Sequence, residues 1–68
     1  MNVKLHLVND QKNVELNLPK SALAGDTLKE LGIPPDTVII TRNSHPIPLD
    51  SPLEDKDELV VIRVVSGG

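Results

Sequence analysis

The sequence predicts a two-layer α+β domain, in which a mixed four- to five-stranded sheet packs on a single helix. Two segments near the N-terminus alternate apolar and polar residues, as half-buried strands do, whereas the segment from Ser21 to Leu31 has helical spacing. Near the C-terminus, the β-branched segment from Glu58 to Val65 predicts the longest strand. One helix together with several strands favours two packed layers.

The first two strands are predicted to form a hairpin. Residues 3–7 alternate apolar and polar side chains, and the same pattern covers residues 14–18, which Pro19 ends. Residues 9–13 between them form a polar turn sequence. We therefore expect two antiparallel strands joined by a loop of about four or five residues.

A helix of about two to three turns is predicted over residues 21–31. Ser21 is a candidate N-cap, and Gly25-Asp26 offers a later start. Gly32 has the position of a left-handed residue after the last turn, and Pro34-Pro35 prevents the helix from continuing. Four residues of the segment share one helix face: Leu23, Thr27, Leu28 and Leu31.

Three further strands are expected after the helix. The first contains Val38-Ile39-Ile40, and three consecutive apolar residues leave open which of them face the core. Pro46-Ile47-Pro48 can form only a short edge strand, because proline has no N–H to donate. Leu53 is expected to anchor the turn formed by Asp50-Ser51-Pro52. A right-handed crossover then places the first strand beside the last, which is the β-grasp arrangement. The expected core is Val3, Leu5, Leu7, Leu16, Leu28, Leu31, Leu59 and Val61.

The last strand is apolar on both of its faces, although one helix can cover only one face of the sheet. Leu59 and Val61 are expected to face the helix. The other face would then expose a contiguous apolar surface, which on a small protein usually marks a partner-binding site. An alternative is that these residues are only strand formers scattered on the surface. The candidate partner-binding residues are Val60, Ile62, Val64 and Val8.

Composition argues against several function classes. The net charge of -3 and the absence of Phe, Trp and Tyr argue against nucleic acid as a direct partner. The absence of cysteine excludes disulfides, thiolate metal sites and a cysteine nucleophile in this sequence. No apolar run is long enough to span a bilayer, and the N-terminus lacks the apolar segment of a signal peptide. We expect a cytoplasmic monomer with no membrane partner.

The polar residues predict neither a catalytic centre nor a metal site. His6 and His45 are the only histidines and lie far apart in the sequence, with no close carboxylate motif. No Ser-His-Asp spacing or glycine-rich phosphate loop is present. The acidic run at Glu54, Asp55, Asp57 and Glu58 is interpreted either as a solvated turn or as a patch that steers a basic partner.

Gly67-Gly68 directly follows the last predicted strand. Because glycine has no Cβ, such an end can pass through a narrow channel and bring its carboxylate close to a nucleotide phosphate. A carboxylate must be activated before it accepts a nucleophile, and acyl-adenylation with ATP bound to a partner would achieve this. We therefore expect a β-grasp domain over residues 1–65 and a flexible Ser-Gly-Gly tail over residues 66–68.

An ordered set of segments covers nearly the whole chain: Met1-Asn2-Val3, residues 26–33, Asn43, residues 53–57 and residues 64–68. Through this set the chain resembles the small archaeal modifier proteins and the related ubiquitin-like sulfur carriers. Such carriers often have Asn-Gly at Asn43-Ser44 and Asp-Gly-Asp at Asp55-Lys56-Asp57, and these departures affect turns. The absence of aromatic residues departs from many molybdopterin synthase small subunits.

The resemblance implies a carrier rather than an enzyme. It implies that an activating enzyme resembling ubiquitin E1 adenylates the Gly68 carboxylate with ATP and Mg²⁺, that Gly67 gives clearance, and that the chain holds no cofactor stably. A sulfur donor would then form a thiocarboxylate for tRNA thiolation or cofactor biosynthesis, or a lysine of a target protein would form an isopeptide bond, or both. The alternatives are a non-covalent ubiquitin-like interaction domain and a small subunit of molybdopterin synthase.

Overall fold

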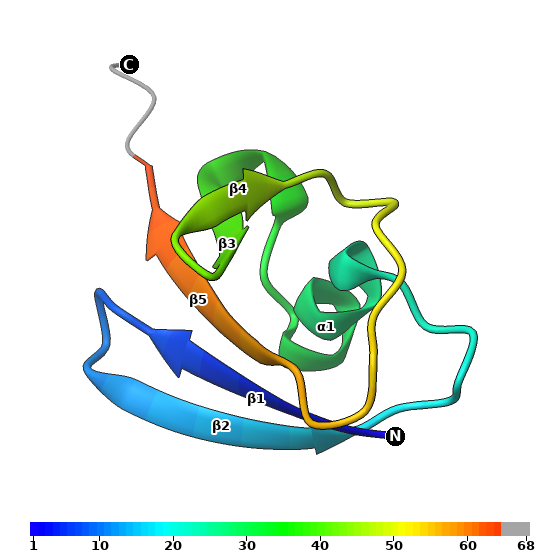
Figure 1. Ribbon diagram of the computed structural model, residues 1–68. Coiled ribbons are helices and arrows are strands. Elements are labelled where there is room, and N and C mark those ends of the chain that lie inside the picture. Colours follow the sequence, from blue (N-terminus) through cyan, green and yellow to red (C-terminus); the bar gives the residue numbers. More distant parts are fainter. Residues whose placement is uncertain (65–68) are drawn as a thin grey trace.

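The computed structural model describes residues 1–64, whose strands form one sheet that packs on one α-helix (Figure 1). The sheet has five strands in the order β2-β1-β5-β3-β4. It is mixed, because β1 and β5 run parallel whereas the other neighbouring strands are antiparallel. The first and last strands lie side by side in the centre, which confirms the predicted β-grasp arrangement.

The first two strands form the predicted antiparallel hairpin, and its loop has the predicted length. β1 (Asn2–Leu7) pairs with β2 (Lys12–Asn17), with Leu5 opposite Val14. Residues 8–11 join the two strands, and Gln11 takes up a left-handed conformation with φ of 48°. Alternate residues of β1 are buried, so one face of the hairpin packs against the core and the other stays open.

The helix begins later than Ser21, so the N-cap prediction at that residue is wrong. α1 spans Ala24–Leu31, so it begins one residue before the alternative start at Gly25-Asp26, and its N-cap is Leu23. Leu23 has no side-chain acceptor, and its own N–H donates to Asp26 Oδ2 at 2.8 Å. The carboxylate thus supplies one half of a capping box, and it also lies favourably in the first turn.

A neighbouring loop replaces the missing side-chain cap. The N–H groups of Ala24 and Gly25 donate to the carbonyls of Ser51 and Leu49, at 2.9 and 2.8 Å. A Cβ on Gly25 would come within 3.2 Å of the Leu49 carbonyl oxygen, so this close approach favours glycine. Backbone carbonyls that are distant in sequence therefore satisfy the first turn, and local sequence could not reveal them.

The end of the helix agrees with the prediction. Gly32 is left-handed with φ of 68°. The N–H groups of Gly32 and Ile33 donate to the carbonyls of Lys29 and Leu28, at 3.2 and 2.9 Å. A short 3₁₀ turn, η1 (Pro35–Thr37), then leads into the sheet.

β5 (Glu58–Arg63) lies between β1 and β3 (Val38–Arg42), and β4 (His45–Ile47) forms the predicted short edge strand. β5 ends before Val65, which lies outside the described residues. It has 6 residues, as β1 and β2 also do, so the prediction that it is the longest strand is wrong. β5 ends at Arg63 because the next hydrogen bonds go to partners outside the sheet. The Arg63 N–H donates to a side chain of the hairpin turn, and the Val64 N–H donates to a carbonyl of η1.

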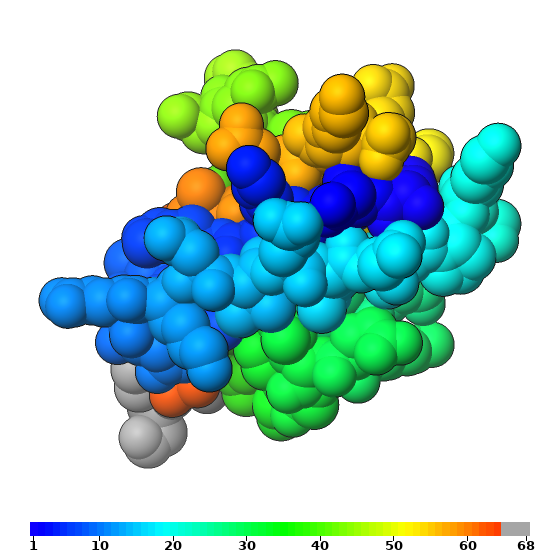
Figure 2. Space-filling model, turned by 90° about the horizontal axis from the view of Figure 1, so that it is seen from below, coloured from blue at the N-terminus to red at the C-terminus, as the bar shows by residue number. Residues whose placement is uncertain are grey.

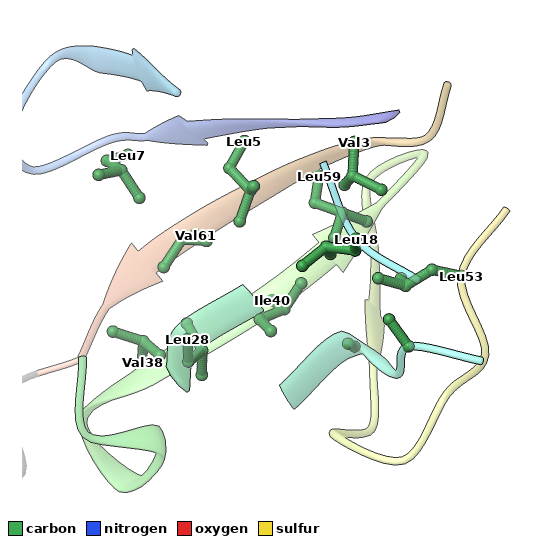
Figure 3. Close-up of a cluster of buried hydrophobic side chains, with 12 residues drawn as sticks. Val3, Leu5, Leu7, Leu18, Leu28, Val38, Ile40, Leu53, Leu59 and Val61 are labelled. Atoms are coloured by element: carbon green, nitrogen blue, oxygen red, sulfur yellow. The ribbon is translucent and has the colours of Figure 1, made fainter. Parts of the chain in front are cut away.

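The core lies between the sheet and α1, with side chains from both layers pointing into it (Figure 3). Leu16 and Leu31, which the sequence placed in the core, are only half-buried and pack against its margin, because β2 is an edge strand and Leu31 ends the helix. The other six predicted core residues are buried, as is the expected anchor Leu53. The core also contains these residues: Leu18, Ala22, Ala24, Val38 and Ile40.

Two tight turns use left-handed residues that are not glycine. Asn43 and Ser44, with φ of 53° and 66°, join β3 to β4. Lys56, with φ of 67°, lies in the turn before β5, and its N–H donates to the Asn2 carbonyl at 2.6 Å. A side chain in this conformation costs about 1–2 kcal/mol.

Candidate functional site

The face of the sheet opposite α1 carries a strip of apolar side chains. In Figure 2, β2 (light blue) lies at the near edge of the sheet. The green residues around position 30, at the end of α1, lie on one side of it only. On the open side, Val60 is half-buried, and Ile62 of the same strand is 38% exposed. Leu59 and Val61 between them are buried, so the two faces of β5 are assigned as the sequence predicted.

Val8 extends the strip from the neighbouring strand. Its N–H donates to the Val61 carbonyl at 3.1 Å, which continues the parallel ladder one residue past the end of β1 and places Val8 beside Ile62. Val8 is 41% exposed, and Val64, directly after β5, is 36% exposed. The structure therefore brings the four predicted residues to the end of the sheet at which β5 terminates.

Ile39 also belongs to this strip, and the sequence did not identify it. It lies directly opposite Ile62 in the β3–β5 ladder and is 42% exposed, whereas Val38 and Ile40 are buried. Three consecutive apolar residues hid the register of β3, which is set by its pairing with β5. The open-face strip, as we use the term below, comprises Val8, Ile39, Val60, Ile62 and Val64.

The other end of the open face is polar. Lys4 lies between Glu15 of β2 and Glu58 of β5 in the strand register. His6 follows two residues later on β1, and its Nδ1 lies 2.6 Å from Asn13 Oδ1. The open face therefore changes from charged side chains near the start of β5 to apolar ones near its end.

The acidic run before β5 has structural roles at two of its four carboxylates. Asp57 Oδ2 accepts from Arg42 Nη1 at 3.1 Å and from the Glu54 N–H at 2.9 Å. Asp55 Oδ1 accepts the Asn2 N–H at 2.7 Å, and this bond holds the pKa of the Asp55 carboxyl below its ordinary value. These contacts favour the interpretation of the run as a turn that fixes the start of β1 and β5.

The two histidines lie on different strands, His6 on β1 and His45 on β4. Within residues 1–64, no group of three or more His, Asp or Glu side chains is arranged to hold a metal ion. The helix in this part of the chain is also too short to cross a membrane. Gly67 and Gly68, the candidate reactive end, lie outside the described residues, so their role stays a prediction.

The chain is similar in sequence to one protein family and to two further proteins. Residues 1–65 match the sequence profile of the family described as small archaeal modifier protein 2. An uncharacterized protein of Archaeoglobus fulgidus is 38% identical over 69 residues, covering all of both chains. The sulfur carrier protein TtuB of Thermus thermophilus is 35% identical over 43 residues, covering 63% of this chain and 66% of that protein.

Solved structures have the same fold. Small archaeal modifier protein 1 of Haloferax volcanii superposes over all of both chains, with a TM-score of 0.76 and 22% identity. The ubiquitin of Caldiarchaeum subterraneum covers 100% of this chain and 98% of its own, with a TM-score of 0.76 and 23% identity. These similarities confirm the predicted ubiquitin-like β-grasp fold.

Proposed function

Because the chain belongs to the small archaeal modifier protein 2 family, we propose that it is activated at the carboxyl group of Gly68 by an E1-like enzyme. Its family is one of ubiquitin-like modifiers and carriers and not of catalysts. The observation that carries the proposal is the open-face strip at the end of β5, the strand that leads toward Gly67-Gly68.

Activation is an acyl-adenylation. A carboxylate oxygen of Gly68 attacks the α-phosphorus of ATP, pyrophosphate leaves with the electrons of the broken P–O bond, and Mg²⁺ on the activating enzyme neutralises the phosphates. The product is a mixed anhydride, whose carbonyl carbon is now electrophilic. No stable cofactor on this chain is needed, because the nucleotide belongs to the activating enzyme.

The open-face strip is the docking surface in this proposal. Burying exposed Ile62, Ile39 and Val8 against an apolar surface of the enzyme removes them from water and favours association. Four residues follow Val64 and span at most about 14 Å when extended. An enzyme on the strip must therefore hold its ATP within about that distance of Val64. Docking and chemistry are thus coupled by a short tether.

The adenylate has two possible fates. A sulfur donor that delivers a sulfide-equivalent nucleophile displaces AMP and leaves a thiocarboxylate, and the name of the Thermus thermophilus relative supports this fate. Alternatively, the amine of a target lysine displaces AMP and forms an isopeptide bond, as the word modifier in the family description suggests. The sequence has no cysteine, so carried sulfur would have to be bound at Gly68 itself.

In this proposal the protein meets ATP in the cytoplasm of its native host. Mass spectrometry of the protein isolated from that host tests the proposal. We expect a fraction of the chain to carry sulfur in place of one terminal oxygen, or lysines of other proteins to carry Gly-Gly remnants after proteolysis. The first result would indicate sulfur carriage, for tRNA thiolation or cofactor biosynthesis, and the second protein modification. Finding neither, under sulfur limitation and under stress, would favour a non-covalent interaction domain instead.

A further inference from the structure

The hairpin turn next to β5 interrupts the regular ladder of backbone hydrogen bonds between β1 and β5. The Val8 N–H extends the ladder to the Val61 carbonyl, but the Val8 carbonyl accepts the Gln11 N–H at 3.2 Å within the turn. In a regular parallel ladder, that carbonyl would be the acceptor for the N–H of Arg63. The N–H of Arg63, the last residue of β5, therefore lacks its regular backbone acceptor.

The side chain of Asn9 takes the place of this acceptor. Its Oδ1 accepts the Arg63 N–H at 2.8 Å, a distance typical of a well-formed hydrogen bond, across 54 positions of sequence. Asn9 belongs to the polar turn sequence, and neither the core nor the open-face strip includes it. Its contact with Arg63 is a specific link between the hairpin turn and the end of the last strand.

A second contact holds the next residue from the opposite side. The Val64 N–H donates to the Thr37 carbonyl of η1 at 2.8 Å. The Thr37 hydroxyl in turn donates to the Pro34 carbonyl at 2.7 Å, which holds η1 in its turn. Consecutive N–H groups at the end of β5 are therefore fixed from two sides, by the hairpin turn and by η1.

We propose that Asn9 is a positioning residue for activation at Gly68, because it fixes the point at which the chain leaves the sheet. The proposal rests on the activation proposed above. Without Asn9, the Thr37 carbonyl is the remaining partner that holds this end of β5, and in molecules in which its bond to the Val64 N–H opens, the tether to Gly68 lengthens from four residues to six. Effective concentration falls at least as the −3/2 power of tether length, so this change alone lowers it about twofold.

Three variants test the role of Asn9. Asn9→Ala removes the acceptor, Asn9→Asp retains a side-chain oxygen at the same position, and Asn17→Ala is a matched control in β2, away from the end of β5. In amide hydrogen exchange, Asn9→Ala should exchange the Arg63 N–H about fivefold faster, with the Leu5 and Leu59 amides unchanged. Asn9→Asp should restore most of the protection, and Asn17→Ala should leave it at the wild-type level.

ATP–pyrophosphate exchange with the activating enzyme provides the second measurement. Asn9→Ala should lower kcat about two- to fivefold and leave KM within about twofold, since the four residues of the open-face strip other than Val64 stay in place in the sheet. A wild-type kcat in Asn9→Ala, an unchanged Arg63 amide, or a rise in KM alone would each overturn the positioning role. If the wild-type chain itself supports no exchange, the proposed activation fails, and this outcome differs from a failure of Asn9 alone.

Discussion

Two substitutions in β5 test which of its faces forms the core. Leu59 is 1% exposed and lies beside Leu5, itself 1% exposed, whereas Ile62 is 38% exposed on the open face. Leu59→Ala and Ile62→Ala each remove the same number of carbon atoms from the same strand. The pair therefore compares burial while the size of the deletion and the secondary structure stay constant.

The structure sets the size of the expected difference. Removing the buried atoms of Leu59 costs about 2.5 kcal/mol from transfer alone and about 3–4 kcal/mol with the cavity that remains. Because Ile62 is partly in water already and its truncation leaves no enclosed cavity, Ile62→Ala should cost about 1 kcal/mol. The two free energies of unfolding should thus differ by about 2–3 kcal/mol.

Urea unfolding followed by far-UV circular dichroism measures both values. A domain of this size has a stability of about 3–10 kcal/mol, so Leu59→Ala could leave little folded protein in water. Leu59→Val, with an expected cost of about 1 kcal/mol, then gives a measurable transition. Equal costs for Leu59→Ala and Ile62→Ala, or a larger cost at Ile62, would refute the assignment of the two faces.

Three further changes test other parts of the structure. Ile62→Asp or Ile39→Asp should leave the fold intact but raise KM for the activating enzyme at least about tenfold, because a carboxylate would have to be desolvated at the interface. An unchanged KM in both variants would contradict docking through the open-face strip. Lys56→Gly should stabilise the fold by about 0.5–1 kcal/mol in urea unfolding, because relief at φ of 67° exceeds the added entropy of the unfolded chain; a loss of stability would contradict this. The Asn2 N–H lowers the folded-state pKa of Asp55 below 3.8, so its stabilisation is present above pH 3.8 and is lost as the pH falls through the folded-state pKa. Asp55→Asn should therefore be less stable than wild type at neutral pH and approach it in acid, whereas a difference that does not change with pH would argue against this bond.

The sequence predicted the hairpin, the first strand beside the last and both faces of β5, because these depend on patterns that are strong in a short chain. Alternation fixes the inward residues of β1, and a single helix leaves one face of β5 exposed. The same reasoning found Val8, Ile62 and Val64 on the open face. Period-two patterning and the number of covering layers are both visible without coordinates.

The features that the sequence did not predict depend on contacts between distant segments. The carbonyls of Leu49 and Ser51 cap the first turn of α1, so no N-cap side chain marks its start. Ile39 has apolar neighbours on both sides, and only pairing with β5 assigns it to the open face. In the sequence Asn9 is an ordinary turn residue, and only the fold brings it to Arg63. Each of these contacts joins segments that local patterns treat separately.

The central claim is that the Gly68 carboxylate is the group that becomes activated. The most direct test is ATP–pyrophosphate exchange with the E1-like enzyme of the same host, comparing the full chain with a chain that lacks Gly67-Gly68. We expect exchange with the full chain and none with the shortened one, although their free energies of unfolding should agree within about 0.5 kcal/mol. Equal exchange by the two chains would contradict the claim for both the carrier and the modifier function.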